Sequence, residues 1–338
     1  MSRGVRRRQR QQPRTLQVFL AVVLVLLTVC VLVKAFFLKA PEQKAAELPA
    51  QPAASDTDDS QQSREEQAAQ EALRSHLERK GGFYTILLSG LDDDNGGSDT
   101  NILVAVDTVN GYVYGVSIPR DSKAIIDGKA RKINYAYNKG GTELLADTVS
   151  EQLGIPVDYT VSVNLKGFTA LVDAIGGVDF DVPINMDYDD PIQNLSIHFK
   201  KGVQHLSGAD ALRVVRFRHN NDGSGYGSED LGRMATQQKF LKAVAKKMLS
   251  AGNILTKIDD YAKIFNQYVD TNLTVGNLAW LGTEVLKMGV DKIDFSTLPN
   301  AWKYPYIYLD PTETLTLVNT YLNPYVEDRT AEDLHLPS

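Results

Sequence analysis

The chain has 338 residues, of which 43% are hydrophobic and 23% charged, and its formal net charge is -6. This composition is typical of a globular protein and excludes a wholly disordered chain, a collagen-like repeat and a multi-span membrane protein. The single cysteine excludes a disulfide framework and a cysteine-rich zinc site. All charged residues in 1–39 are basic, so the rest of the chain is strongly acidic, and we expect no nucleic-acid binding.

An apolar segment follows the basic tail. Residues 16–38 contain one charged residue, Lys34, and as a helix they would span roughly 34 Å, enough for a bilayer core of about 30 Å. The arginines before them predict that tail 1–15 is cytoplasmic and that the rest of the chain is extracytoplasmic. A cleaved signal peptide normally has a shorter apolar core and a small-residue cleavage site. The sequence therefore favours an uncleaved, single-pass anchor in the cell membrane.

Residues 39–80 are predicted to be an extracytoplasmic linker and stalk. Their first part, 41–63, is rich in Ala, Pro, Gln, Ser and Asp, which is typical of a disordered spacer. Residues 63–80 are polar but helix-prone, which predicts a short stalk helix.

The pattern from residue 81 onward predicts a mixed α/β domain. Short apolar or alternating runs predict strands, and amphipathic runs with capping residues predict helices. The expected strands are 83–89, 101–107, 112–118, 159–163, 178–182 and one near 292–298, and the expected helices include 141–153, 166–175, a short one opened by 207–210, and 229–249. Since no linker-like composition interrupts 81–325, we expect one catalytic domain, followed by a C-terminal tail at 326–338.

Two acidic residues flank a glycine-rich turn between the first two strands. Asp92 follows the end of one strand and Asp99 precedes the next, so both carboxylates are expected at one edge of the sheet. Carboxylates with open coordination positions suit Mg²⁺, which also accepts phosphate oxygens. The alternative is a solvated acidic turn.

Basic residues follow in three groups. Arg120 and Asp121 come directly after the third strand, and Lys132 lies shortly beyond them. Arg216 and Arg218 would face the same way in an extended segment. Each group alone could be a solvated surface pair or a surface salt bridge.

The third group is Arg233 and Gln237, which share one face of the long predicted helix. Planar guanidinium groups bind phosphate bidentately, and a divalent cation neutralises its non-bridging oxygens. The two carboxylates and the three groups of basic and polar side chains together therefore indicate magnesium-assisted phosphoryl transfer. An outward-facing domain has no ATP supply, which points to a lipid phosphate or diphosphate as donor.

The order of these motifs resembles the LytR-CpsA-Psr family. The matching segments are Gly90–Asp92, Ser98–Thr100, Ile118–Asp121, Lys132–Tyr137, Val157–Tyr159, Leu171–Val178, Leu206–Leu212, Arg216–Arg218 and Asp230–Gln238. The resemblance implies an α/β/α sandwich with a central mixed sheet and an apolar lipid pocket. It also implies an enzyme that moves a glycopolymer, such as wall teichoic acid or capsular polysaccharide, from a polyprenyl-diphosphate carrier to peptidoglycan.

The resemblance further implies roles for individual residues. Asp92 and Asp99 would bind Mg²⁺. Beyond what the resemblance implies, our own hypothesis is that Asp121 orients Arg120 or accepts the proton of the acceptor hydroxyl. The expected catalytic residues are Arg120, Asp121 and Arg218. The implied diphosphate-binding residues are Arg120, Lys132, Arg216, Arg218, Arg233 and Gln237.

Helix residues Leu171, Ile175, Phe240 and Val244 are predicted to line the lipid pocket, the alternative being an ordinary core. The chain departs from the family pattern at Gly97, where an arginine is usual, and extra acids beside Asp92 could replace it at the metal. Two alternative functions remain open: a polyprenyl-diphosphate pyrophosphatase and a non-catalytic envelope regulator that binds lipid or glycan.

Overall fold

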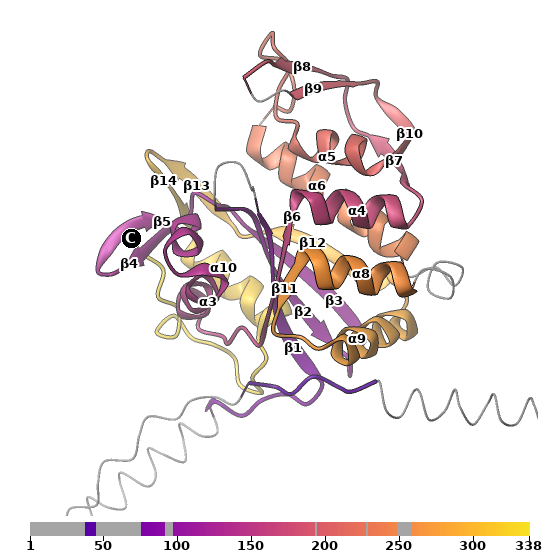
Figure 1. Ribbon diagram of the computed structural model, residues 1–338. Coiled ribbons are helices and arrows are strands. Elements are labelled where there is room, and N and C mark those ends of the chain that lie inside the picture. Colours follow the sequence, from indigo (N-terminus) through magenta and orange to yellow (C-terminus); the bar gives the residue numbers. More distant parts are fainter. Residues whose placement is uncertain (1–37, 45–75, 92–96, 193–194, 228, 249–257) are drawn as a thin grey trace, which may run out of the picture.

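The computed structural model describes residues 38–44, 76–91, 97–192, 195–227, 229–248 and 258–338 (Figure 1). The predicted membrane segment lies outside these residues except for its last position, as do the basic tail, most of the linker and Asp92. Within the described ranges, no helix is both long and apolar enough to cross a bilayer.

A six-stranded sheet forms the centre of the fold (Figure 1). Its strand order is β11-β6-β1-β2-β3-β12, in which β1, β2 and β3 form an antiparallel meander while β6 runs parallel to β1 and β12 parallel to β3. The strands are β1 (Phe83–Leu91), β2 (Ser98–Asp107), β3 (Tyr112–Ile118), β6 (Tyr159–Asn164), β11 (Val269–Thr271) and β12 (Ile293–Thr297). The predicted mixed α/β fold with a central mixed sheet is confirmed.

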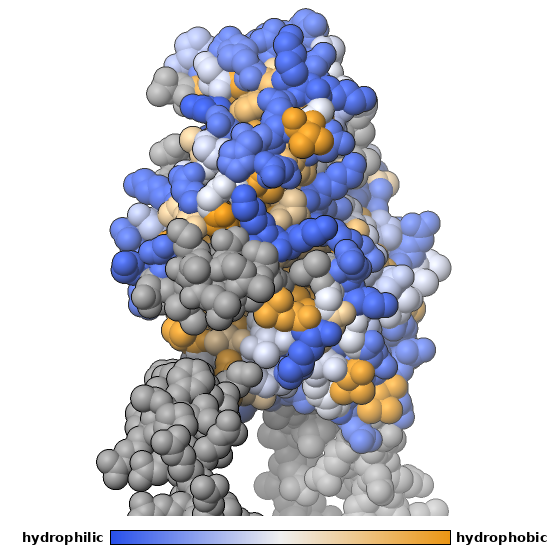
Figure 2. Space-filling model, turned by 90° about the vertical axis from the view of Figure 1, so that its right-hand side faces the viewer, coloured by the Kyte–Doolittle hydropathy of each residue, from blue (hydrophilic) through white to orange (hydrophobic). Residues whose placement is uncertain are grey.

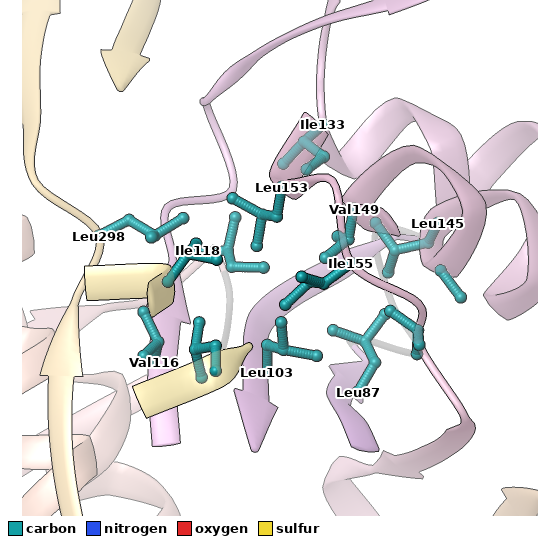
Figure 3. Close-up of a cluster of buried hydrophobic side chains, with 14 of the residues drawn as sticks. Leu87, Leu103, Val116, Ile118, Ile133, Leu145, Val149, Leu153, Ile155 and Leu298 are labelled. Atoms are coloured by element: carbon teal, nitrogen blue, oxygen red, sulfur yellow. The ribbon is translucent and has the colours of Figure 1, made fainter. Parts of the chain in front are cut away.

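Both faces of the sheet are buried, because alternate residues of β1 and β2 enter different hydrophobic clusters. On one face Leu87 and Leu103 pack against Leu145 and Val149 of α3 (Asn134–Leu153) (Figure 3). The other face packs against α6 (Glu229–Met248) and α9 (Val275–Met288). Each large aliphatic side chain buried in this way contributes roughly 1.5–3 kcal/mol.

A third hydrophobic cluster extends the domain beyond one end of the sheet. It joins α4 (Leu165–Ala174), α5 (Gly208–Arg216) and α6 to four short strands (Figure 1). These strands are β7 (Val178–Val182), β8 (Met186–Asp190), β9 (Leu195–Phe199) and β10 (Gly202–Leu206).

Further short elements complete the fold. The helices are α8 (Ile258–Tyr268) and α10 (Pro311–Leu317), followed by a π-helical turn at Val318–Leu322, and a 3-10 turn occupies Val290–Lys292. Two further hairpins are β4 (Lys123–Ile126) with β5 (Lys129–Lys132), and β13 (Asn300–Lys303) with β14 (Tyr306–Leu309).

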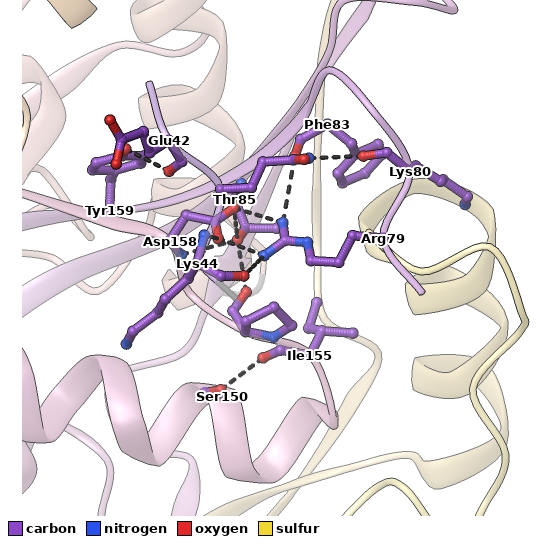
Figure 4. A network of polar contacts seen from close by, with 12 residues as sticks. Glu42, Lys44, Arg79, Lys80, Phe83, Thr85, Ser150, Ile155, Asp158 and Tyr159 are labelled. Carbon is purple, nitrogen blue, oxygen red and sulfur yellow. Dashed lines mark hydrogen bonds and ion pairs between the residues drawn. The ribbon is translucent and has the colours of Figure 1, made fainter. Parts of the chain in front are cut away.

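The described ends of the expected linker pack on the domain instead of standing apart from it (Figure 4). Asp158, the residue before β6, accepts two hydrogen bonds from Arg79 at 2.7 and 2.8 Å and one from the Lys44 amide at 3.0 Å. The Gln43 side chain donates to the Phe83 carbonyl at 2.7 Å. Residues 39–44 and 76–80 are thus held at the N-terminal end of β1.

The expected C-terminal tail is likewise part of the domain. Arg329 is 3% exposed and lies over the Tyr325 ring, and the His335 amide donates to the Gln152 carbonyl at 3.2 Å. The domain therefore extends past residue 325.

The molecular surface turned toward the viewer in Figure 2 is mostly hydrophilic in its upper part, and apolar residues gather in small groups lower down.

Candidate functional site

A cavity of about 650 Å³ lies between the sheet and the third hydrophobic cluster. Most of its wall is apolar and comes from β1, β6, α4, β8, β9 and α6. The apolar lining residues include Leu88, Val161, Val163, Phe168, Leu171, Leu195, Ile197, Val215, Phe240 and Leu241. Its size falls in the range of roughly 300–1,000 Å³ that is usual for small-molecule sites.

Polar residues from the ends of the central strands form another part of the wall. Asp99 lies in β2 where β1 and β2 lose their regular register, and Arg120 follows β3. The Arg120 guanidinium donates to Asp99 Oδ1 at 2.6 Å, and the two side chains are 31% and 43% exposed. Both side chains are therefore within reach of water, whereas Phe240 in the same cavity is fully buried.

Asp121 links Arg120 to the predicted lysine. Its Oδ1 lies 3.9 Å from Arg120 Nε and 3.1 Å from Lys132 Nζ. Lys132 ends β5 and is absent from the described wall of the cavity, so it reaches Arg120 only through Asp121. This geometry suits Asp121 as an orienting residue for Arg120.

Arg216 and Arg218 both line the cavity, although not from a continuous extended segment as expected. Arg216 is the last residue of α5, whose N-terminus is capped by the Ser207 hydroxyl, and the chain becomes extended only at Phe217. Phe217 is 1% exposed and contacts the Tyr226 ring edge-on. Phe217 lines the cavity together with its two arginine neighbours, so this turn after α5 contributes both apolar and basic groups to the wall.

Arg233 and Gln237 line the cavity from one face of α6, as their spacing predicts. Gln238, the next residue, donates to Ser117 Oγ at 2.9 Å and to the Ser296 carbonyl at 2.8 Å. These bonds attach α6 to β3 and β12 and so fix its rotation. Arg233 is only 9% exposed, so its positive charge lies in a weakly solvated wall.

Positive charge predominates among the described lining residues, where four arginines face a single carboxylate, that of Asp99. A cation in an apolar wall attracts an anion more strongly than it would in water. The cavity can therefore hold an amphiphilic anion, with its charged group at the arginines and its apolar part against the aliphatic wall.

The four predicted pocket residues separate into two pairs. Leu171 and Phe240 line the cavity. Ile175 and Val244 are 2% and 6% exposed and are absent from its described wall; they belong to the third hydrophobic cluster, where they pack as core.

Sequence reasoning missed Tyr188 and His219, which also line the cavity. Their rings meet edge-on at 5.6 Å. Burial, followed by the nearby Asp190 carboxylate, raises the pKa of Tyr188, while Arg218 opposes this shift. The phenol is therefore a neutral hydrogen-bond donor at pH 7. The alternation of β8, with aspartates on either side of Tyr188, was the signal that could have revealed it.

Gly97, the departure from the family pattern, has a backbone φ of +114°, a conformation that side chains rarely adopt. An added Cβ would lie 3.0 Å from the Asn138 side-chain oxygen. An arginine at this position would therefore require a local change of backbone.

A recess of about 20 Å³ adjoins the cavity and shares Asp99, Arg120 and Arg233 with it. Asp121 also lines this recess. Mg²⁺ is usually bound by one or two carboxylates together with waters and substrate phosphates, and a carboxylate can accept Arg120 on one oxygen and face a cation with the other. The described residues contain no group of three or more metal-ligating side chains. The carboxylates of Asp99 and Asp121 are thus a donor set that fits a Mg²⁺ ion shared with waters and a phosphate.

The fold and site define an α/β protein with an arginine-lined anion site at one end of an apolar cavity. A family model, the LytR_cpsA_psr family, matches residues 49–322. The chain belongs to the LytR-CpsA-Psr family.

Two curated relatives carry names that describe a reaction. TagV of Bacillus subtilis (strain 168), a polyisoprenyl-teichoic acid–peptidoglycan teichoic acid transferase, is 37% identical over 202 residues, which are 57% of this chain and 50% of that protein. TagU of Bacillus cereus (strain ATCC 14579), of the same description, is 37% identical over 195 residues, or 56% of this chain and 60% of that protein. The chain thus spans about half the length of the first relative and three-fifths of the second.

The crystal structure of B. subtilis TagV has the same fold, with a TM-score of 0.60 at 32% identity. The match covers 71% of this chain and 96% of that one. A structure from Enterococcus faecalis, titled a transcriptional regulator, matches with a TM-score of 0.60 at 26% identity over 74% of this chain and 91% of that one.

Proposed function

We propose that this protein transfers a glycopolymer from a polyprenyl-diphosphate carrier to peptidoglycan. The convergence of Arg120, Arg216, Arg218 and Arg233 on one otherwise apolar cavity carries the proposal. A polyprenyl diphosphate has the matching parts, a dianionic headgroup and a long apolar tail. The names of TagV and TagU support teichoic acid as one such polymer; capsular polysaccharide is a second candidate.

In the proposed reaction an acceptor hydroxyl of the peptidoglycan glycan attacks the phosphorus atom next to the glycopolymer. A new P–O bond forms, the P–O bond to the lipid phosphate breaks, and polyprenyl monophosphate leaves. The polymer is then joined to the wall through a phosphodiester. The arginines stabilise the negative charge that builds up on the phosphoryl oxygens.

The proton of the acceptor hydroxyl must leave during this attack. Asp121 is our candidate to receive it, since its carboxylate lines the recess beside Arg120. A Mg²⁺ ion bound by Asp99, with Asp92 as the proposed second ligand, would neutralise phosphate oxygens. Lys132, whose Nζ lies 3.1 Å from Asp121 Oδ1, would hold this carboxylate in place.

The proposed reaction also bears on where the protein is located in the cell. We propose that residues 16–38 anchor the chain in the cell membrane with residues 1–15 in the cytoplasm and the domain outside, where carrier lipid and peptidoglycan meet. The apolar run and its preceding arginines support this orientation.

The test uses purified protein with a polyprenyl-diphosphate glycan and peptidoglycan. Arg216→Lys removes a bidentate phosphate contact and is expected to lower transfer roughly tenfold to a hundredfold. Arg213→Lys is the matched control, because Arg213 lies on the same helix but pairs with Asp210 at 2.9 Å outside the cavity. Equal activity of the two variants would contradict the proposal.

Two other outcomes would support the alternative functions, a pyrophosphatase and a non-catalytic regulator. Phosphate release without glycan linkage would support a pyrophosphatase that uses the same site. Full envelope function in cells carrying the Asp99→Ala variant would support a non-catalytic regulator.

A further inference from the structure

The β13–β14 hairpin exposes a run of large side chains at its tip. Trp302 is 59% and Tyr304 85% exposed, and every residue from 301 to 305 is exposed. Large aromatic side chains are stabilised by burial, so their grouping at an exposed tip indicates a ligand-binding or partner-binding surface.

This hairpin is attached to the wall of the anion site. The Ile307 amide donates to the Asp121 carbonyl at 3.0 Å, and Ser122 forms an isolated bridge with Ile307. Buried Ile307 lines the small recess together with Asp99 and Asp121. Figure 1 shows β13–β14 beside the β4–β5 hairpin.

The strand register places Trp302 next to that recess. Trp302 pairs directly with Ile307 across the hairpin. Directly paired residues project from the same face of a two-stranded ribbon, with Cβ atoms roughly 5 Å apart. The exposed indole therefore continues the surface that Ile307 begins at the recess.

Basic side chains lie beside other aromatic rings of this region, among them Tyr308, which pairs with Ala301 on the opposite face of the hairpin. Lys123 Nζ lies 4.9 Å and Lys303 Nζ 5.6 Å from the centre of the Tyr308 ring, and Arg131 lies 5.4 Å from that of Tyr135. Aromatic rings stack on the C–H faces of sugar rings, and lysine and arginine pair with carboxylates. Peptidoglycan presents both groups, sugars in its glycan strand and carboxylates in its peptide stems.

We propose that Trp302 and Tyr304, at the tip of this hairpin, form an acceptor surface that binds the peptidoglycan glycan strand and brings its hydroxyl to the recess beside Asp121. This inference rests on the proposed transferase function and adds the site of its second substrate. The surface continues directly into the recess, as a two-substrate reaction requires.

Tryptophan, tyrosine and lysine side chains also gather where proteins meet lipid. The position of this hairpin on the domain nevertheless favours the glycan over a membrane as its partner. Gln43, which follows the expected membrane segment, bonds to Phe83 at the first residue of β1. The recess lies beyond the other end of β1, where Leu91 pairs with Ser98 next to Asp99. A nine-residue strand separates these positions by roughly 26 Å.

The test compares the Trp302→Ala/Tyr304→Ala double variant with wild type and with Val203→Ala, a control at a position 75% exposed on β10. Protein is sedimented with purified insoluble peptidoglycan and, separately, with liposomes of anionic lipid. We expect the double variant to lose roughly tenfold in affinity for peptidoglycan, as is usual when aromatic anchors are truncated. Its thermal unfolding and its binding of a polyprenyl diphosphate are expected to stay at wild-type values.

Unchanged sedimentation of the double variant with peptidoglycan would overturn the inference, and so would a loss confined to liposomes. Failure of the proposed function has a different signature, since transfer would then be insensitive to Arg216→Lys. A double variant that keeps arginine-dependent donor binding but loses acceptor binding and transfer supports both.

Discussion

The ion pair that holds residues 39–44 to the domain gives the sharpest stability prediction. Asp158→Asn replaces a carboxylate whose side chain is 0% exposed and which pairs with Arg79, itself 9% exposed. The carboxylate accepts from Arg79, the Lys44 amide and both the amide and hydroxyl of Thr85. An asparagine offers one acceptor oxygen and would turn an N–H group toward one of these donors.

The expected cost follows from burial of the remaining cation. Removing one member of a buried ion pair typically costs about 3–5 kcal/mol, since the other charge stays desolvated without compensation. For a domain of this size each kcal/mol lowers the melting temperature by about 2–4 °C, so Asp158→Asn is expected to lower it by roughly 6–20 °C.

Thermal unfolding followed by circular dichroism measures this shift. Asp294→Asn is the matched control, because Asp294 is 68% exposed and pairs with Lys242 at the surface, where such a pair is worth at most about 1 kcal/mol. Hydrogen exchange at the Lys44 amide should also accelerate in the Asp158 variant, since that amide donates to Asp158. A melting temperature within 2 °C of wild type would refute the assigned role of the pair.

Three further predictions concern single positions. Gly97→Arg is expected to lower stability by about 1–3 kcal/mol in denaturant titrations, because φ there is +114°. Phe240→Ala should cost about 3–5 kcal/mol and enlarge the cavity, as a crystal structure would show. The pKa of His198 is raised above 6.5, chiefly by its hydrogen bond to Asp187. Desolvation lowers this pKa and the Asp189 carboxylate raises it further, so the net shift is upward. The stabilisation from protonated His198 is therefore present below pH 6.5 and is lost as pH rises through the folded-state pKa; NMR titration should show Asp187→Asn lowering that value.

The sequence was informative where local signals agree with the tertiary fold. The strand predicted at 112–118 is observed with the same bounds, Tyr112–Ile118, and it forms a hairpin with β2. The i, i+4 spacing of Arg233 and Gln237 placed both on the cavity face of α6. These features depend on neighbours in the chain, so a linear pattern can record them.

Other features depend on contacts that no local pattern contains. A helix was predicted over 141–153, but the structure adds a helical stretch from Asn134 that is separated from it by a break at Gly140 and Gly141, where Gly141 has φ of +67°. Ile175 and Phe240 are both apolar and buried, yet only Phe240 reaches the cavity. Whether an apolar side chain lines a cavity or fills a core is decided by packing and not by its residue type.

A crystal structure of the protein with a bound polyprenyl diphosphate tests the central claim most directly. We expect the diphosphate within hydrogen-bonding distance of Arg120, Arg216, Arg218 and Arg233, with the apolar tail running along Leu171 and Phe240. A diphosphate bound elsewhere, or a tail directed away from this cavity, would contradict the account.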